Sequence, residues 1–125
     1  MLDKLVVLVV EDDQSNSLLL KAMLEKRGAT VIIARNGREA INIALNNSQI
    51  QIVLMDIKLP EVNGLEATKA IKKEKPNLPI IAQTAYAMEE DRYRCLEAGC
   101  DDYIVKPIIQ EELFHKLQEF TKKGL

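Results

Sequence analysis

The sequence LVVLVVEDD at residues 5–13 places three acidic residues directly after six apolar ones. An unbroken run of valine and leucine favours a strand buried on both faces, which is the usual setting of strands in parallel sheets. Similar short apolar segments lie at residues 30–34, 51–55, 79–83 and 102–105. The sequence therefore predicts a five-stranded sheet that is covered on both sides.

Segments with the helical spacing of apolar residues alternate with these strands, at residues 15–26, 37–45, 65–74, 88–98 and 110–122. Strict alternation of strand and helix predicts right-handed crossovers and a doubly wound α/β fold with a parallel sheet and five helices. Such sheets commonly have the flavodoxin-like strand order 2-1-3-4-5, although the pattern alone leaves the order open. With no linker or repeat in the chain, we expect residues 1–125 to form a single domain.

Composition excludes several classes of protein. The 125 residues include 47% hydrophobic and 29% charged ones, which argues against disorder. The longest fully apolar run, residues 5–10, is far shorter than the roughly 20 residues of a membrane-spanning helix. We read no secretory signal, so we expect a cytoplasmic protein in which Cys95 and Cys100 are reduced packing residues. A net charge of −2 gives no reason to expect nucleic-acid binding.

Polar residues follow four of the predicted strands: acidic residues 11–13, then Asp56, Thr84 and Lys106. Ligands of open α/β sheets bind outside the carboxyl ends of the strands, so these side chains are expected to converge at one rim. Each has an ordinary alternative. Asp13 and Thr84 could cap helices, and Lys106 could be a solvated loop residue.

Together, these residue types indicate phosphoryl chemistry. Three neighbouring carboxylates repel one another, so at neutral pH they either take up protons or bind a hard cation. An oxygen-only site suits Mg²⁺ better than zinc, and Mn²⁺ is the other cation that we expect. A lysine and a threonine hydroxyl beside such a cation can hold a phosphoryl group, and one carboxylate can act as the nucleophile.

Five motifs in order resemble the receiver domain of two-component response regulators. They are LVVEDD at 8–13, LMDIKLP at 54–60, NG at 63–64, QTA at 83–85 and AGCDDYIVKP at 98–107. The resemblance covers essentially the whole chain. It implies a phospho-acceptor signalling domain that takes a phosphoryl group from phosphohistidine and assists its own phosphorylation, rather than an enzyme that turns over an external substrate.

The resemblance also implies individual roles. Asp56 matches the phospho-acceptor, and Thr84, Lys106 and Tyr103 match the residues that respond to the phosphoryl group. The metal ligands would be Glu11, Asp12, Asp56 and the backbone carbonyl of Lys58, and the bond before Pro107 should be cis. Lys58 and Tyr86 stand where the family varies, beside the approach of the hydrolytic water, and we expect them to prolong the phosphorylated state.

The sequences AQTAYAM at 82–88 and CLEAGCDDY at 95–103, with Asn16, resemble receivers of hybrid sensor histidine kinases in particular. The implied partner is a histidine kinase or a histidine phosphotransfer protein, with no direct contact to nucleic acid or membrane. In a hybrid kinase the domain would lie on the cytoplasmic side of the membrane. The output face would comprise predicted helix 88–98, strand 102–105 and helix 110–122. The resemblance is also compatible with a dimer that forms on phosphorylation.

Two other classes of protein share part of this pattern. A haloacid-dehalogenase-type phosphatase needs two aspartates separated by one residue after the first strand, and residues 11–13 lack that spacing. A flavodoxin-like electron carrier needs a phosphate loop rich in serine, threonine and glycine, which is not visible. The run Leu18, Leu19 and Leu20 spans about 200° of a helix, so we expect at least one of them, Leu18 above all, to be exposed for docking.

Overall fold

The apolar segments form one parallel sheet in the computed structural model, which describes residues 2–59, 62–85 and 89–123. Its strands are β1 (Val6–Val10), β2 (Thr30–Ala34), β3 (Ile52–Asp56), β4 (Ile80–Thr84) and β5 (Asp102–Val105). Their order is β2-β1-β3-β4-β5, so the predicted fold class and strand order are confirmed. Strands β3 and β4 run one residue further than predicted, because Asp56 and Thr84 still pair with neighbouring strands.

Five helices alternate with the strands in the described part of the chain, as predicted, and the last of them follows β5. They are α1 (Gln14–Glu25), α2 (Gly37–Asn46), α3 (Gly64–Glu74), α4 (Glu89–Ala98) and α5 (Gln110–Lys123). Side-chain oxygens of Asp13, Asn36 and Asn63 accept backbone N–H groups in the first turns of α1, α2 and α3. These bonds satisfy donors that have no partner inside a helix. None of the described helices has both the length and the apolar character that crossing a bilayer requires.

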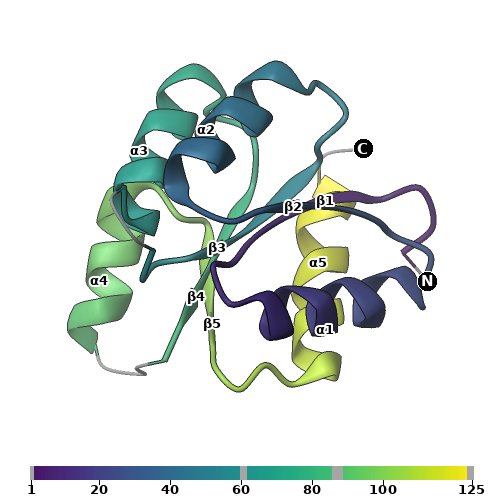
Figure 1. Cartoon of the computed structure of the whole chain (residues 1–125). Helices are drawn as coiled ribbons and strands as arrows, with labels where there is room; N and C mark the ends of the chain where they lie inside the picture. The colour runs from purple at the N-terminus through teal and green to yellow at the C-terminus, as the bar shows by residue number, and fades with distance from the viewer. Residues whose placement is uncertain (1, 60–61, 86–88, 124–125) are drawn as a thin grey trace.

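The helices form two layers around the sheet (Figure 1). Helices α1 and α5 pack on one face, against strand residues such as Val7, Leu54 and Ile104. Helices α2, α3 and α4 pack on the other face, against residues such as Leu8 and Met55. Both sets of strand residues are buried, which explains why the strands are continuously apolar rather than alternating.

The order of the strands decides where a ligand can sit. The chain crosses from β1 to β2 on one side and from β2 over β1 to β3 on the other, so the switch point lies between β1 and β3. Asp56 pairs with Gln83, and Gln83 pairs with Ile104, in one row across β3, β4 and β5. The carboxyl ends of these strands therefore form a single rim, at the point where open α/β sheets bind ligands.

Candidate phospho-acceptor and metal site

Three carboxylates meet at this rim. Glu11 follows β1, Asp12 follows Glu11, and Asp56 ends β3, and one oxygen of each lies within 4.8 Å of the others. Glu11 and Asp56 are 2% and 5% exposed, whereas Asp12 faces solvent. The predicted convergence is therefore found in the structure, with two buried members and one that water can reach.

Lys106 is the counter-charge of the cluster. Its Nζ lies 3.0 Å from Oε2 of Glu11 and 3.1 Å from Oδ2 of Asp56. The backbone N–H of Lys106 donates to the carbonyl of Thr84 at 2.7 Å, and the Lys106–Pro107 peptide bond is cis, as expected. The connection after β5 thus holds the ammonium between two carboxylates.

The loop after β3 passes close to Asp56. The backbone N–H of Lys58 donates to Oδ1 of Asp56 at 3.0 Å. A Cβ on Gly64 would lie 2.1 Å from the carbonyl oxygen of Asp56, so only glycine allows α3 to begin this close to the strand. Asn63 and Glu66 form a capping box that sets the start of α3.

Burial and ion pairing act against each other in this cluster. Burial raises the pKa of Glu11 above its ordinary 4.5, and this outweighs the opposing hydrogen bond from Lys106, while the charge of Asp56 adds to the rise. Burial alone would lower the pKa of Lys106, but its hydrogen bonds with Glu11 and Asp56 outweigh burial and raise it above 10.5. The lysine is therefore charged at neutral pH, beside carboxylates that it only partly neutralises.

The donor set fits a hard divalent cation. Three acidic side chains face one ammonium in this cluster, and the grouped ligand atoms are all oxygens. Mg²⁺ prefers carboxylate oxygens and keeps several water ligands, for which the exposed Asp12 leaves room. The residues present therefore fit Mg²⁺ held by Glu11, Asp12 and Asp56.

The remaining predicted residues lie around this centre. Thr84 is buried at the end of β4, next to the strand that carries Asp56. Tyr103 is half-buried on β5 against the helices of the α2–α4 layer, and Arg92 lies over its ring at 5.6 Å from the centroid. Lys58 is exposed beside Asp56. Tyr86 lies outside the described residues.

The structure also tests the predictions for Asp13, for the two cysteines and for the three consecutive leucines of α1. Asp13 caps α1 and accepts from the N–H of Asn16, so the ordinary alternative holds for this aspartate. Cys95 and Cys100 are buried thiols that form no disulfide within the described residues, and burial raises the pKa of the Cys100 thiol to about 12, which keeps it protonated and unreactive. Leu18 and Leu19 are both exposed, whereas Leu20 is buried.

The sequence motif QTA contains a residue, Gln83, whose importance the sequence did not reveal. It is fully buried in β4, and neither polar atom of its side-chain amide has a partner within the described part of the chain. A polar residue inside a strand predicted to be buried on both faces is the signal that could have revealed it. The close approach of Gly64 to Asp56 was missed as well, because only the folded loop brings them together.

A family model described as the response regulator receiver domain matches residues 7–118. The chain belongs to the response regulator receiver family. This receiver is 44% identical over 104 residues to the polar-differentiation response regulator DivK of Brucella anthropi, covering 82% of this chain and 84% of DivK. This family match favours the receiver interpretation over the phosphatase and flavodoxin alternatives.

Larger proteins also contain similar receivers. This chain is 42% identical to a segment of hybrid signal transduction histidine kinase I of Dictyostelium discoideum and 37% identical to a segment of the sensor protein GacS of Pseudomonas syringae pv. syringae. The alignments cover 86% and 95% of this receiver but only 7% and 14% of the two proteins. The chain thus spans a small part of these relatives and most of DivK.

Solved receiver structures agree with the fold. The receiver domain of sensor histidine kinase PA1611 from Pseudomonas aeruginosa PAO1 superposes with a TM-score of 0.88 at 36% identity, over 94% of this chain and 98% of that one. That structure has a magnesium ion coordinated in its active site cleft. A CheY-like receiver of Methanospirillum hungatei JF-1 gives a TM-score of 0.88 at 33% identity, over 95% and 94% of the chains. Receiver domains take phosphoryl groups from histidine kinases or phosphotransfer proteins.

Proposed function

We propose that Asp56 is the phospho-acceptor of this receiver, and that a phosphohistidine on a kinase or phosphotransfer protein is the donor. The observation that carries the proposal is the position of Asp56, buried at the end of β3 between the Lys106 ammonium and the N–H of Lys58. Both groups lie within hydrogen-bond distance of its carboxylate and hold it at the rim. Asp56 is also the buried aspartate of the three-carboxylate cluster.

In the proposed reaction, a carboxylate oxygen of Asp56 attacks the phosphorus atom as the phosphorus–nitrogen bond to the histidine breaks. The imidazole leaves and takes up a proton, and an acyl phosphate remains on the aspartate. The Lys106 ammonium can shift its ion pair from the Asp56 carboxylate to the phosphoryl oxygens without leaving the site, because its Nζ already contacts Asp56.

Glu11, Asp12 and Asp56 would hold Mg²⁺, with the backbone carbonyl of Lys58 as a further ligand, and Mn²⁺ is expected to substitute. Bound there, the cation supplies positive charge that offsets the repulsion between the carboxylates and the incoming phosphoryl group. The chain's own part is to hold Asp56 and Glu11 together at the rim, away from bulk water, with the Lys106 ammonium paired to both.

We propose that phosphorylation is read on the face formed by α4, β5 and α5. Thr84 would bond the phosphoryl group, and Tyr103 on the adjacent strand would follow its movement. Tyr93 and Leu96 on α4 and Ile109 before α5 are large exposed apolar residues that could contact a partner or a second copy on phosphorylation. Such a change is a shift between two conformations rather than turnover of a substrate, so we propose a signalling role and not a separate enzymatic one.

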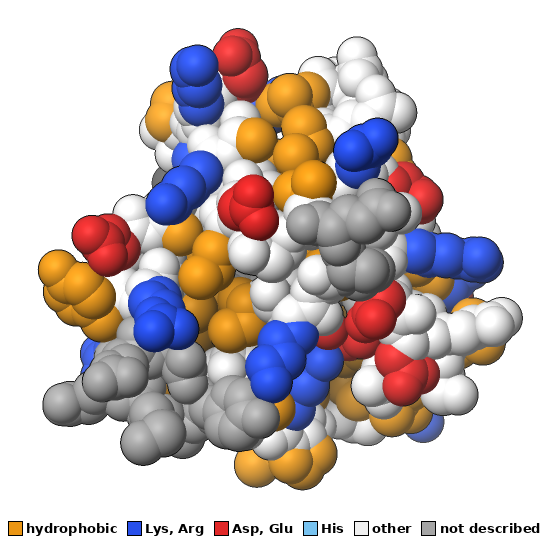
Figure 2. All heavy atoms as spheres, turned by 60° about the vertical axis from the view of Figure 1, so that its left-hand side comes forward, with side chains coloured by type: hydrophobic (Ala, Val, Ile, Leu, Met, Phe, Trp, Pro, Cys, Tyr) orange, Lys and Arg blue, Asp and Glu red, His pale blue; other side chains and the backbone are white. Residues whose placement is uncertain are grey.

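We further propose that the chain acts as a single receiver domain on the cytoplasmic side, either alone or within a hybrid kinase. Its charges do not suggest a nucleic-acid site. Figure 2 shows basic and acidic side chains interspersed over the face that carries α3 and α4, without a broad basic patch. This mixture is a poor match for the phosphate backbone of DNA or RNA.

The test of the proposed function is phosphoryl labelling of the Asp56→Asn variant. With acetyl phosphate and Mg²⁺, we expect intact-mass spectrometry to show one added phosphoryl group on the parent protein and none on the variant. Asp13→Asn is the matched control, because asparagine caps a helix as well as aspartate does and Asp13 lies outside the metal cluster. Unreduced labelling of Asp56→Asn would show that another residue accepts the phosphoryl group.

A further inference from the structure

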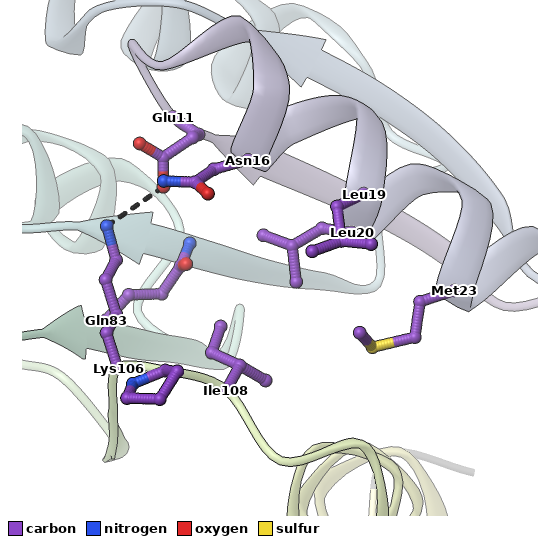
Figure 3. Close-up of a pocket in the computed structure, with 9 residues that line it drawn as sticks. Glu11, Asn16, Leu19, Leu20, Met23, Gln83, Lys106 and Ile108 are labelled. Atoms are coloured by element: carbon purple, nitrogen blue, oxygen red, sulfur yellow. Dashed lines mark hydrogen bonds and ion pairs between the residues drawn. The ribbon is translucent and has the colours of Figure 1, made fainter.

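A pocket of about 400 Å³ opens between α1 and the connection from β5 to α5 (Figure 3). One end is polar, with Glu11, Asn16, Gln83 and Lys106. The rest is apolar and is lined by Leu19, Leu20, Met23, Pro107 and Ile108. This volume falls in the range of small-molecule sites, which are mostly apolar with a few polar groups that orient the ligand.

The amide of Gln83 marks the polar end as a binding point. Figure 3 shows its side chain reaching from β4 toward α1, with the amide facing the ends of Glu11 and Asn16. The residue is 0% exposed, and both Nε2 and Oε1 lack a hydrogen-bond partner among the described residues. A buried amide without partners is costly, so a donor and an acceptor are available for a molecule that enters the pocket.

The neighbouring charges restrict what that molecule can be. Lys106 is already paired with Glu11 and Asp56, so a ligand with a net charge would have to compete with one side of these ion pairs. A neutral group that carries both a donor and an acceptor would satisfy Gln83 without disturbing them. Carboxamides and lactams have such a group. Since leucine, methionine and isoleucine side chains line the rest of the pocket, the remainder of the ligand should be compact and apolar.

We propose that this pocket binds a small neutral amide, in which a carboxamide or lactam edge pairs with Gln83 and an apolar body lies between α1 and Ile108. The bound molecule would lie beside Glu11 and Lys106, and therefore next to the acidic cluster. The inference does not depend on Asp56 being the phospho-acceptor.

The experiment uses 4-phenylbutanamide as the probe and 4-phenylbutanoate as its charged counterpart, in NMR titrations without a phosphoryl donor. We expect a saturable shift of the Gln83 side-chain NH₂ signals with the amide, and affinity for the carboxylate weaker by about tenfold or more, because it lacks the N–H donor and is repelled by Glu11. Since no phosphoryl donor is present, the result is independent of the labelling test at Asp56.

Gln83→Leu and Gln83→Met keep the size of the side chain and remove the amide. Both should weaken binding of the amide by about tenfold, read from the shifts of the backbone signals that line the pocket. Gln49→Leu, at an exposed glutamine outside the pocket, is the matched control and should bind as the parent does. An absence of saturable shifts in the parent, or equal affinity in folded Gln83→Leu or Gln83→Met, would overturn the proposal.

Discussion

The Nζ of Lys106 lies 3.0 Å from Oε2 of Glu11, although 95 positions separate the two residues. The pair joins the end of β1 to the connection after β5 across the rim that also carries Asp56. Its acid is almost fully buried, so the ion pair compensates only part of the cost of ionising Glu11.

This ion pair predicts a pH dependence. Since the pKa of Glu11 is raised in the folded state, the native protein takes up a proton before the unfolded chain does as the pH falls. The contribution of Glu11 to the free energy of unfolding should therefore rise as the pH falls from its raised pKa toward the ordinary 4.5. Lys106 acts at the other end of the scale, because its contribution is present below 10.5 and is lost as the pH rises through its raised pKa.

Urea unfolding of the parent and of Glu11→Gln at several pH values isolates the contribution of Glu11 to stability at acidic pH. The difference in unfolding free energy between the two proteins should change over this acidic range, and Mg²⁺ should stabilise the parent less as Glu11 takes up its proton. Parallel pH profiles for the two proteins would contradict the role given to Glu11.

Divalent cations should stabilise the folded protein. A ligand that binds only the native state raises stability, by about 2.7 kcal/mol at one hundred times its dissociation constant, so the melting temperature should climb with Mg²⁺ concentration. Asp12→Ala removes one of the three clustered carboxylates and should abolish most of this climb. Potassium chloride at matched ionic strength controls for screening, and an equal climb with that salt would argue against a specific site.

Exposed leucines on α1 predict a docking surface for the phosphodonor. Leu18 and Leu19 are 52% and 62% exposed, and the same helix begins next to the acidic cluster. Leu18→Ser should lower the rate of transfer from a phosphotransfer protein by about fivefold, which corresponds to about 1 kcal/mol, while labelling by acetyl phosphate is unchanged. Leu96→Ser on α4 replaces an equally exposed leucine in the other helix layer and should leave the transfer rate unchanged.

The lifetime of the phosphorylated state should depend on Lys58. Its side chain is exposed two positions after Asp56, where its ammonium can lie against phosphoryl oxygens and obstruct the in-line water. Lys58→Asn should shorten the half-life of the phosphorylated protein in Mg²⁺ buffer, since the shorter amide can orient a water instead. Lys69→Asn, on the exposed side of α3, is the control, and a half-life in Lys58→Asn equal to the parent's would show that obstruction is not the larger effect.

Gly64 should be essential to the stability of the loop that carries the site. A methyl group at this position would lie 2.1 Å from the carbonyl oxygen of Asp56 and 2.6 Å from the Cα of Ile57, and both contacts involve backbone atoms that cannot rotate away. Gly64→Ala should lower the free energy of unfolding by about 2 kcal/mol or more, measured by urea denaturation. The same shift should weaken stabilisation by Mg²⁺, and an unchanged denaturation midpoint would mean that the loop relaxes without cost.

Much of this molecule follows from local sequence. Continuous apolar runs define all five strands to within one residue, because strands buried on both faces need no alternation. Helix starts at Asp13, Asn36 and Asn63 depend on side-chain oxygens that cap the helices within a few residues. The acidic and basic residues at the strand ends likewise predicted a cluster of carboxylates and a lysine at one rim, and the structure brings these side chains together.

Only the tertiary structure decided how these residues meet. Neither the strand order nor the pairing of Lys106 with both Glu11 and Asp56 is encoded by neighbours in sequence, since each depends on which strands lie side by side. The exposure of both Leu18 and Leu19 depends on how α1 packs against the sheet, and so does the burial of the Gln83 amide without a partner among the described residues. Short-range hydrogen bonds and apolar periodicity can be read from a sequence, whereas burial, ion pairing and the raised pKa of Glu11 arise only when distant segments exclude water together.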